Sequence, residues 1–280
     1  MRERSQRFDP GHQTMRGTEF EIFQYREPKP NGVEVHHHDF YEVYYLLDGE
    51  VAYWVEGQTY HLKPGELLLI DPLVLHRPVV DPSTPLYERI VLWINKAYLQ
   101  SFAETADLTA CFGGEPCRVL HLSSVQRTEM HARLSELVRE SYGTEYGGKL
   151  YANGLFLQFM VELNRLARGA DGRLEAREDS SPLVSQVLRL IDEHYSEELS
   201  LESIAANFFV SKYHLSHEFS RAVGTSVYRY IMIKRLLMAR QLLLGGMSPS
   251  EVYGRCGFKD YTNFYRAFKA EYGVSPREMG

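Results

Sequence analysis

The chain has 280 residues, 44% of them hydrophobic and 24% charged, with a formal net charge of −6 at pH 7, which suits two domains that each bury a core. No run of residues approaches the length of a membrane span, and the polar segment 1–10 has no apolar centre, so we expect neither export nor membrane insertion. Three cysteines, Cys111, Cys117 and Cys256, make no even disulfide framework and no paired metal-binding motif, which favours a cytoplasmic protein.

Residues 19–94 are predicted to form a succession of short strands. The segments rich in Val, Ile, Tyr, Trp and Leu are 34–47, 51–55, 58–62, 67–70 and 87–94. Turn sequences such as Asp48-Gly49-Glu50 separate these segments. So many short strands predict a β-barrel or a sandwich.

A histidine and glutamate motif lies in the first of these segments. The run His36-x-His38-x-x-x-Glu42, followed by Gly49, resembles the cupins, which are small jelly-roll barrels. The same resemblance extends to Pro64-Gly65 and to the stretch from Pro72 to His76, although Leu73 stands where the cupin motif usually has glycine. The resemblance implies a three-His-one-Glu site of the kind in which cupin enzymes hold iron, manganese or nickel.

Strand parity brings these side chains together. In an extended chain His36, His38, Glu42 and Tyr44 point to one side, where His76 from a later strand can meet them. Three interpretations remain open: a metal site made by His36, His38, Glu42 and His76, a binding site for a polar effector, or a structural polar cluster. We assign no metal, no cofactor and no catalytic residue.

Two residues of the last strand extend the cluster. Trp93 shares parity with Arg89, and a tryptophan face beside hydrogen-bonding groups suits a sugar or another small polar ring. The alternative is that Trp54 and Trp93 belong to the barrel core. The predicted effector-binding residues are His36, His38, Glu42, Tyr44, His76, Arg89 and Trp93.

From Ser123 onward the apolar period changes to that of helices. Segments 125–142 and 150–167 read as an antiparallel helix pair that either covers the barrel or makes a dimer contact. Residues 169–182 are polar and aperiodic, which predicts a linker between a first domain, 1–168, and a second, 183–280. The second domain opens with a helix over 183–195.

The second domain contains one small helical unit written twice, 49 positions apart. Phe209 falls on Phe258, Phe219 on Phe268 and Gly224 on Gly273, and the small residues Ala205 and Gly254 also match. Each copy reads as a helix-turn-helix, with second helices at 212–223 and about 261–272, capped by Ser211 and Asp260. A helix over 226–244 joins the two copies. The predicted fold class is α+β, with a cupin-like barrel, an appended helix pair and an all-α tandem helix-turn-helix domain.

The outward positions of the two second helices are hydrogen-bonding, aromatic or basic. Such side chains suit base edges and phosphates in a DNA major groove. The charge of this segment also favours DNA binding, because residues 205–280 carry 11 Lys and Arg against five Asp and Glu. The predicted DNA-binding residues are Lys212, Tyr213, His214, Ser216, His217, Arg221, Tyr261, Thr262, Asn263, Arg266 and Lys269.

Residues 183–280 closely resemble the DNA-binding domain of the AraC/XylS (arabinose-regulator) family of bacterial transcription regulators. The most specific matching motif is the ending from Gly257-Phe258 to Pro276. By resemblance, Tyr213, Ser216 and His217 of the first unit and Tyr261, Thr262, Asn263 and Arg266 of the second read bases. His217 stands where arginine is common, and Glu278-Met279 replaces a frequent tyrosine-arginine pair. The resemblance also implies that the helix pair makes a dimer contact and that the histidine run has no enzymatic function.

These features predict a ligand-responsive transcription factor in the cytoplasm. Its expected partners are double-stranded promoter DNA, a small-molecule effector that is possibly a sugar, a second copy of the chain, and RNA polymerase if it activates. The effector acts by binding one arrangement of the protein more tightly than another. The rival hypotheses are a metal-dependent cupin enzyme with a helical appendage and an architectural nucleic-acid protein without a ligand.

Overall fold

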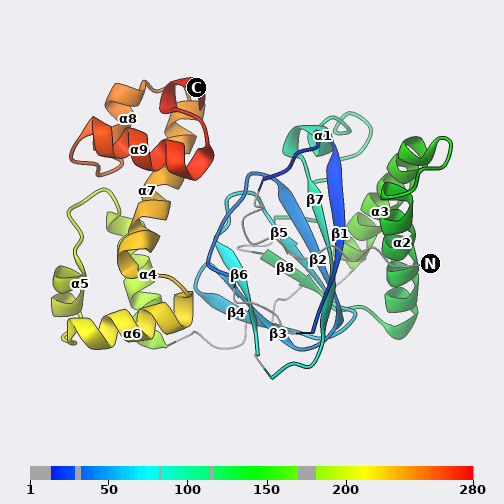
Figure 1. Cartoon of the computed structure of the whole chain (residues 1–280), viewed down its shortest axis with the longest axis horizontal. Coiled ribbons are helices and arrows are strands. Elements are labelled where there is room, and N and C mark those ends of the chain that lie inside the picture. Colours follow the sequence, from blue (N-terminus) through cyan, green and yellow to red (C-terminus); the bar gives the residue numbers. More distant parts are fainter. Residues whose placement is uncertain (1–13, 29–32, 82, 114–116, 170–180, 280) are drawn as a thin grey trace. The chain divides into compact units, whose positions relative to one another are not determined.

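The computed structural model describes residues 14–28, 33–81, 83–113, 117–169 and 181–279 (Figure 1). The chain divides into two compact units, Met1–Glu178 and Asp179–Gly280. The predicted linker, 169–182, lies largely outside the described residues, as does the polar segment 1–10. None of the helices in the described ranges is long and apolar enough to cross a membrane.

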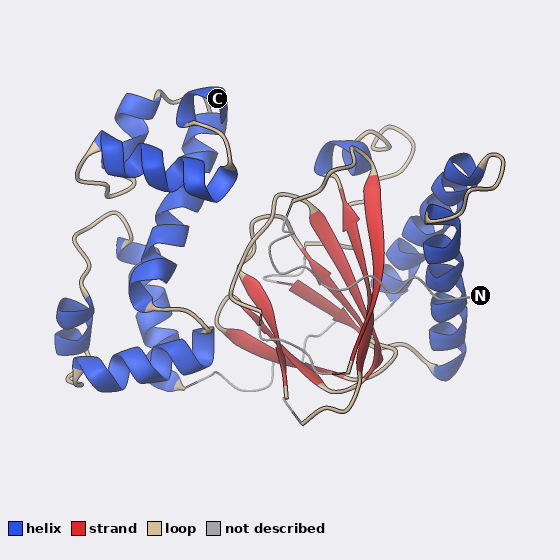
Figure 2. Cartoon of the chain, in the orientation of Figure 1, coloured by secondary structure: helices blue, strands red, loops and turns tan. Residues whose placement is uncertain are grey.

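The first unit contains two antiparallel sheets (Figure 2). The larger sheet has the strand order β1-β7-β2-β5-β8, and the smaller has the order β4-β3-β6. Their bounds are β1 Phe20–Glu27, β2 Tyr41–Asp48, β3 Val51–Val55, β4 Gln58–Leu62, β5 Leu67–Ile70, β6 His76–Val80, β7 Tyr87–Ile94 and β8 Cys117–Leu120. Strands far apart in sequence therefore lie side by side, as β1 and β7 do.

An inner core fills the space between the two sheets. Tyr44 of β2 and Trp93 of β7 pack there with Tyr53 and Val55 of β3, and all four side chains are buried. The predicted α+β fold class, with antiparallel sheets in the first unit and helices in the second, is confirmed. Trp93 thus belongs to the core as well as to the polar cluster.

Helices cover the outer face of the larger sheet. They are α1 Lys96–Gln100, α2 Ser124–Ser141 and α3 Gly148–Gly169. Val43 and Tyr45 of β2 point to this side and pack with Leu134 of α2 and Phe159 of α3. Because both faces of the larger sheet are buried, β2 reads as an almost unbroken apolar run.

The strand predicted over 34–47 begins only at Tyr41, so that part of the prediction is wrong. His36 makes an isolated bridge with His76, and the carbonyl of His38 accepts a hydrogen bond from the N–H of Leu73 at 2.7 Å. The backbone before Tyr41 therefore bonds to the loop before β6 instead of extending the ladder of β2. Strand parity does not explain where His36 and His38 point.

The second unit is helical. Its elements are α4 Pro182–His194, α5 Leu201–Asn207, α6 Lys212–Val223, α7 Val227–Leu244, α8 Pro249–Arg255, α9 Tyr261–Tyr272 and α10 Pro276–Met279. One core gathers Leu236 and Ala239 of α7, Val252 of α8, and Phe264 and Phe268 of α9. At the other end of α7, the ring of Tyr230 lies 5.7 Å from that of Phe219 in α6. The long helix α7 thus carries one small helical unit at each end (Figure 1).

The two helix-turn-helix copies are related by two offsets, and the single offset of 49 is wrong for their first helices. The capping residues Ser200 and Ser248, and the buried Ile204 and Val252, stand 48 positions apart. Only the second helices keep the offset of 49, because the turn before α9 is one residue longer than the turn before α6.

This difference separates residues that the single offset had paired. Phe258 is 7% exposed, whereas Phe209 is 95% exposed. Ala205 is buried, whereas Gly254 is exposed and a Cβ added there would have no neighbour within 4 Å. The predicted match between Ala205 and Gly254 is therefore wrong.

Candidate functional site

Helices α6 and α9 each have one buried and one exposed face. Leu215 and Phe219 of α6, and Phe264 and Phe268 of α9, are fully buried. None of the 11 residues predicted to touch DNA is buried, and Tyr213 is 79% exposed. The exposed or half-buried side chains are Lys212, Tyr213, His214, Ser216, His217, Arg221, Tyr261, Thr262, Asn263, Arg266 and Lys269.

Side-chain caps and glycines set the ends of both helices. The Ser211 hydroxyl accepts from the N–H of His214 at 3.2 Å, and the Asp260 carboxylate accepts from the N–H of Asn263 at 2.8 Å. Gly224 and Gly273 end the helices in the left-handed conformation, with φ of 83° and 74°. Because the first turn of each helix is fixed, the side chains displayed from it have a defined direction.

The exposed polar side chains make short local contacts. Arg266 Nη2 donates to Asn263 Oδ1 at 2.7 Å, and Arg221 Nη2 lies 2.7 Å from Glu218 Oε2. Exposed pairs of this kind contribute about 1 kcal/mol or less, so a phosphate or a base edge can replace them at small cost. Arg266 and Asn263 thus display hydrogen-bond donors and an acceptor side by side, and these are the two side-chain types that most often read guanine and adenine in the major groove.

A buried polar cluster lies between the two sheets of the first unit. His38 Nε2 is 3.2 Å from Glu42 Oε2, and the rings of His38 and His76 are 4.8 Å apart. Glu42 also accepts from the Tyr53 hydroxyl at 3.2 Å and from the indole N–H of Trp93 at 2.9 Å. The structure thus brings together the predicted residues His38, Glu42, His76 and Trp93.

Burial and the neighbouring groups together set the charge of these side chains. It lowers the pKa of His36 to about 4 and the pKa of His76 well below its usual range, with the charges of neighbouring histidines acting in the same direction. Burial alone would raise the pKa of Glu42, but the hydrogen bond and charge of His38, with the charges of His76 and His36, lower it to about 2. At neutral pH Glu42 is ionised and His76 is neutral.

The other predicted effector residues are already engaged with neighbours. The Tyr44 hydroxyl is 2.7 Å from that of Tyr87, and Arg89 Nη1 is 2.8 Å from Glu27 Oε2. The space beside them, lined in part by His36, has a volume of about 30 Å³. Ligand pockets are typically about 300–1,000 Å³. This space holds one or two water molecules but not a sugar ring.

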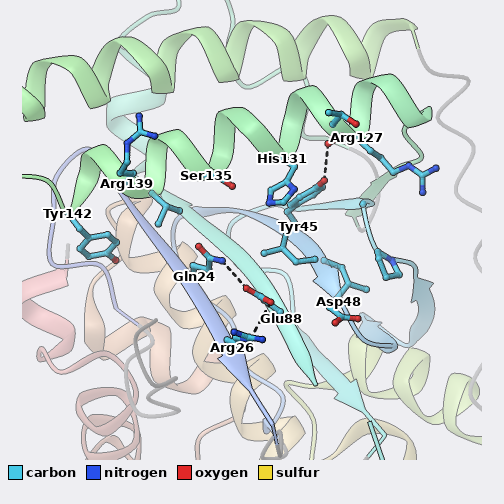
Figure 3. A pocket seen from close by; sticks show the side chains of 16 residues that line it. Gln24, Arg26, Tyr45, Asp48, Glu88, Arg127, His131, Ser135, Arg139 and Tyr142 are labelled. Atoms are coloured by element: carbon cyan, nitrogen blue, oxygen red, sulfur yellow. Dashed lines mark hydrogen bonds and ion pairs between the residues drawn. The ribbon is translucent and has the colours of Figure 1, made fainter. Parts of the chain in front are cut away.

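A much larger cleft lies between the outer face of the larger sheet and α2 (Figure 3). Its volume is about 1000 Å³. Gln24, Arg26 and Glu88 line it from β1 and β7, and His131, Ser135 and Arg139 line it from α2. Glu88 accepts from Gln24 at 2.9 Å and lies 3.7 Å from Arg26.

Sequence reasoning missed this cleft, although α2 carries a signal for it. Arg127, His131, Ser135 and Arg139 follow one another at four-residue steps, so they lie along one stripe of the helix. That stripe adjoins the buried Leu134, and for this reason it borders the core instead of facing open solvent.

Comparison with known proteins bears on both units. Residues 22–160 match the AraC-like ligand binding domain, and residues 204–280 match a helix-turn-helix domain. The chain belongs to the AraC family of transcription regulators. Membership of this family makes it a DNA-binding regulator with a ligand-binding domain, and not an enzyme.

This AraC-family regulator is 27% identical over 248 residues to the HTH-type transcriptional activator RhaS of Salmonella arizonae. The alignment covers 87% of this chain and 86% of RhaS. RhaS of Escherichia fergusonii is 27% identical over 249 residues, with the same coverage. The crystal structure of ToxT from Vibrio cholerae with bound unsaturated fatty acid aligns over 94% of this chain and 95% of ToxT. It has 14% sequence identity and a TM-score of 0.43.

Proposed function

We propose that this AraC-family regulator reads a two-part promoter site with α6 and α9, under the control of a small polar effector. The capped helices carry this proposal, because both direct hydrogen-bonding and basic side chains away from their buried faces. Helix α7 has 18 residues and is therefore about 27 Å long, on the scale of one ~34 Å turn of DNA. A homodimer in the cytoplasm is the proposed form, and its contact with RNA polymerase follows if it activates, as RhaS is named to do.

Selection from a random DNA library at two salt concentrations tests whether the protein recognises a specific DNA sequence. Two conserved blocks about one helical turn apart are the expected product. Recovery of no motif, with binding that vanishes at modest salt, would show that the protein touches phosphate only.

Arg266→Ala is expected to weaken binding to the selected site by about 1–3 kcal/mol, and binding to random DNA much less. The reason is that Arg266 is exposed on α9 and paired with Asn263, an arrangement suited to a base edge. Fluorescence anisotropy with both DNAs measures the two losses. Arg168→Ala, the same change on the exposed end of α3, is the control and should alter neither. Equal losses of binding free energy on both DNAs would mean that Arg266 contacts phosphate and not a base edge.

A carbohydrate in the cleft beneath α2 is the effector we propose. A sugar hydroxyl both donates and accepts hydrogen bonds. The cleft offers acceptors in Glu88 and Asp48, donors in Arg26 and Arg139, and the hydroxyl of Ser135. Its volume supports this location over the space beside His36.

Ser135→Phe is expected to lower sugar affinity at least tenfold, because the new ring fills the middle of the cleft. Calorimetry against a panel of sugars, first with the unaltered chain and then with the variant, measures the effect. Ala132→Phe places the same ring on an exposed position of α2 outside the cleft and should leave affinity unchanged. Equal sugar affinities for the unaltered chain and both variants would show that the effector does not bind in this cleft.

A further inference from the structure

Backbone carbonyls fix a proton on Nδ1 of each buried histidine next to Glu42. Nδ1 of His38 lies 2.9 Å from the carbonyl oxygen of Phe40, and Nδ1 of His76 lies 2.9 Å from that of Val74. A carbonyl oxygen can only accept, so each Nδ1 carries the proton and donates it. In a neutral His76 ring Nε2 is then a lone pair. Nε2 of His38 lies 3.2 Å from the Glu42 carboxylate, which can only accept, so this nitrogen donates there and must give up its proton to bind an ion.

The lone pair of His76 has no use within the protein. His76 is fully buried, and its Nε2 has no hydrogen-bond partner among the described residues. A buried nitrogen without a partner costs free energy, so a native structure normally supplies one. The ligand atoms of His76, His38 and Glu42 all lie within 4.8 Å of one another. Two imidazole nitrogens and a carboxylate oxygen therefore lie close enough together to hold one ion.

We propose that His38, Glu42 and His76 bind a divalent first-row transition-metal ion. Two imidazoles and one carboxylate are the ligand set that iron, zinc and nickel accept, whereas magnesium and calcium require more oxygen ligands. Metal–ligand bonds of about 2.0–2.1 Å place tetrahedral ligand atoms about 3.4 Å apart, so the widest pair in this cluster must draw closer by about 1 Å when the ion binds. The backbone carbonyls of Phe40 and Val74 already provide the outer hydrogen bonds that orient metal-binding histidines.

The ion would join the two sheets. Glu42 belongs to β2 of the larger sheet, with His38 just before it, and His76 begins β6 of the smaller sheet. His36, whose ring lies 4.4 Å from that of His76, stands outside the set of three. Three protein ligands leave a coordination position for water in the adjoining space of about 30 Å³. This inference goes beyond the proposed function and does not depend on the identity of the effector.

Titration with Co²⁺ tests the proposal on the full chain, purified without a histidine tag and stripped with a chelator. One Co²⁺ per chain, with visible d–d absorption that Zn²⁺ abolishes, is the expected result. Glu42→Gln and His76→Gln should each weaken binding by about 100-fold or more. His61→Gln removes an exposed histidine of β4 and should bind as the unaltered chain does.

Two outcomes would overturn the proposal. If the unaltered chain takes up no Co²⁺ or Zn²⁺, then His38 and Glu42 form a buried ion pair without a metal. If Glu42→Gln and His76→Gln both keep full affinity, the ion binds elsewhere. Melting of the unaltered chain covers the case in which both variants fail to fold: Zn²⁺, but not Mg²⁺, should raise its midpoint, and an unchanged midpoint counts against the site.

Discussion

Gly257→Ala is expected to lower the free energy of unfolding of the second unit by about 2–4 kcal/mol and to remove one block from the DNA site. Gly257 has a φ of 79°, which an alanine adopts only with strain. A Cβ at this position would also lie 2.6 Å from the carbonyl oxygen of Ser196. The contact is with backbone, so no side-chain rotation relieves it. The turn that places α9 must therefore move.

Gly254→Ala is the matched control, three residues earlier. Gly254 lies in α8 without a positive φ, and an added Cβ meets nothing within 4 Å. Because alanine is a better helix former than glycine, this variant should gain up to about 1 kcal/mol. Urea unfolding and binding to the two-block DNA measure both variants. If Gly257→Ala folded and bound as well as Gly254→Ala, the tight turn would have no role in placing α9.

Local rules predicted the second unit well because its signals lie within a few residues of each other. Ser211 and Asp260 cap helices at the predicted residues, and Gly224 and Gly273 end them. The same rules failed for Gly254, because counting along one offset ignores an extra residue in a turn. The caps Ser200 and Ser248, 48 positions apart, are the sequence signal for the second offset, and a match along one offset passes over them.

The polar cluster was predicted for a reason that the structure does not support. Strand parity placed His36, His38 and Glu42 on one face, yet the strand begins after His38. The residues meet because the backbone around His36 and His38 bonds to residues 73–76, a long-range contact. The size of the space beside them depends on packing between distant segments, which the sequence does not show. The cleft under α2 has one signal in the sequence, the polar stripe of α2, but its other wall comes from β1 and β7, far away in the chain.

Arg89→Met is expected to destabilise the first unit by about 3 kcal/mol, in the range for removing one partner of a buried ion pair. Arg89 is 3% exposed, and its guanidinium lies 4.2 Å from the ring centre of Tyr87 and 4.9 Å from that of Tyr25. The substitution leaves the carboxylate of Glu27, whose side chain is 20% exposed, without this partner. Urea unfolding followed by tryptophan fluorescence reports the loss, since Trp54 and Trp93 both lie in this unit.

Arg26→Met separates structure from ligand binding. The Arg26 side chain is 54% exposed and lies 3.7 Å from Glu88, so its removal should cost less than about 1 kcal/mol of stability. Arg26 lines the cleft, whereas Arg89 lines the small inner space. We therefore expect Arg26→Met to lower the affinity for the sugar and to leave the stability of the first unit nearly unchanged. Arg89→Met should lower the stability and leave the affinity unchanged. The reverse pattern would return the effector to the space between the sheets, where Arg89 would be a ligand contact and not a support for the barrel.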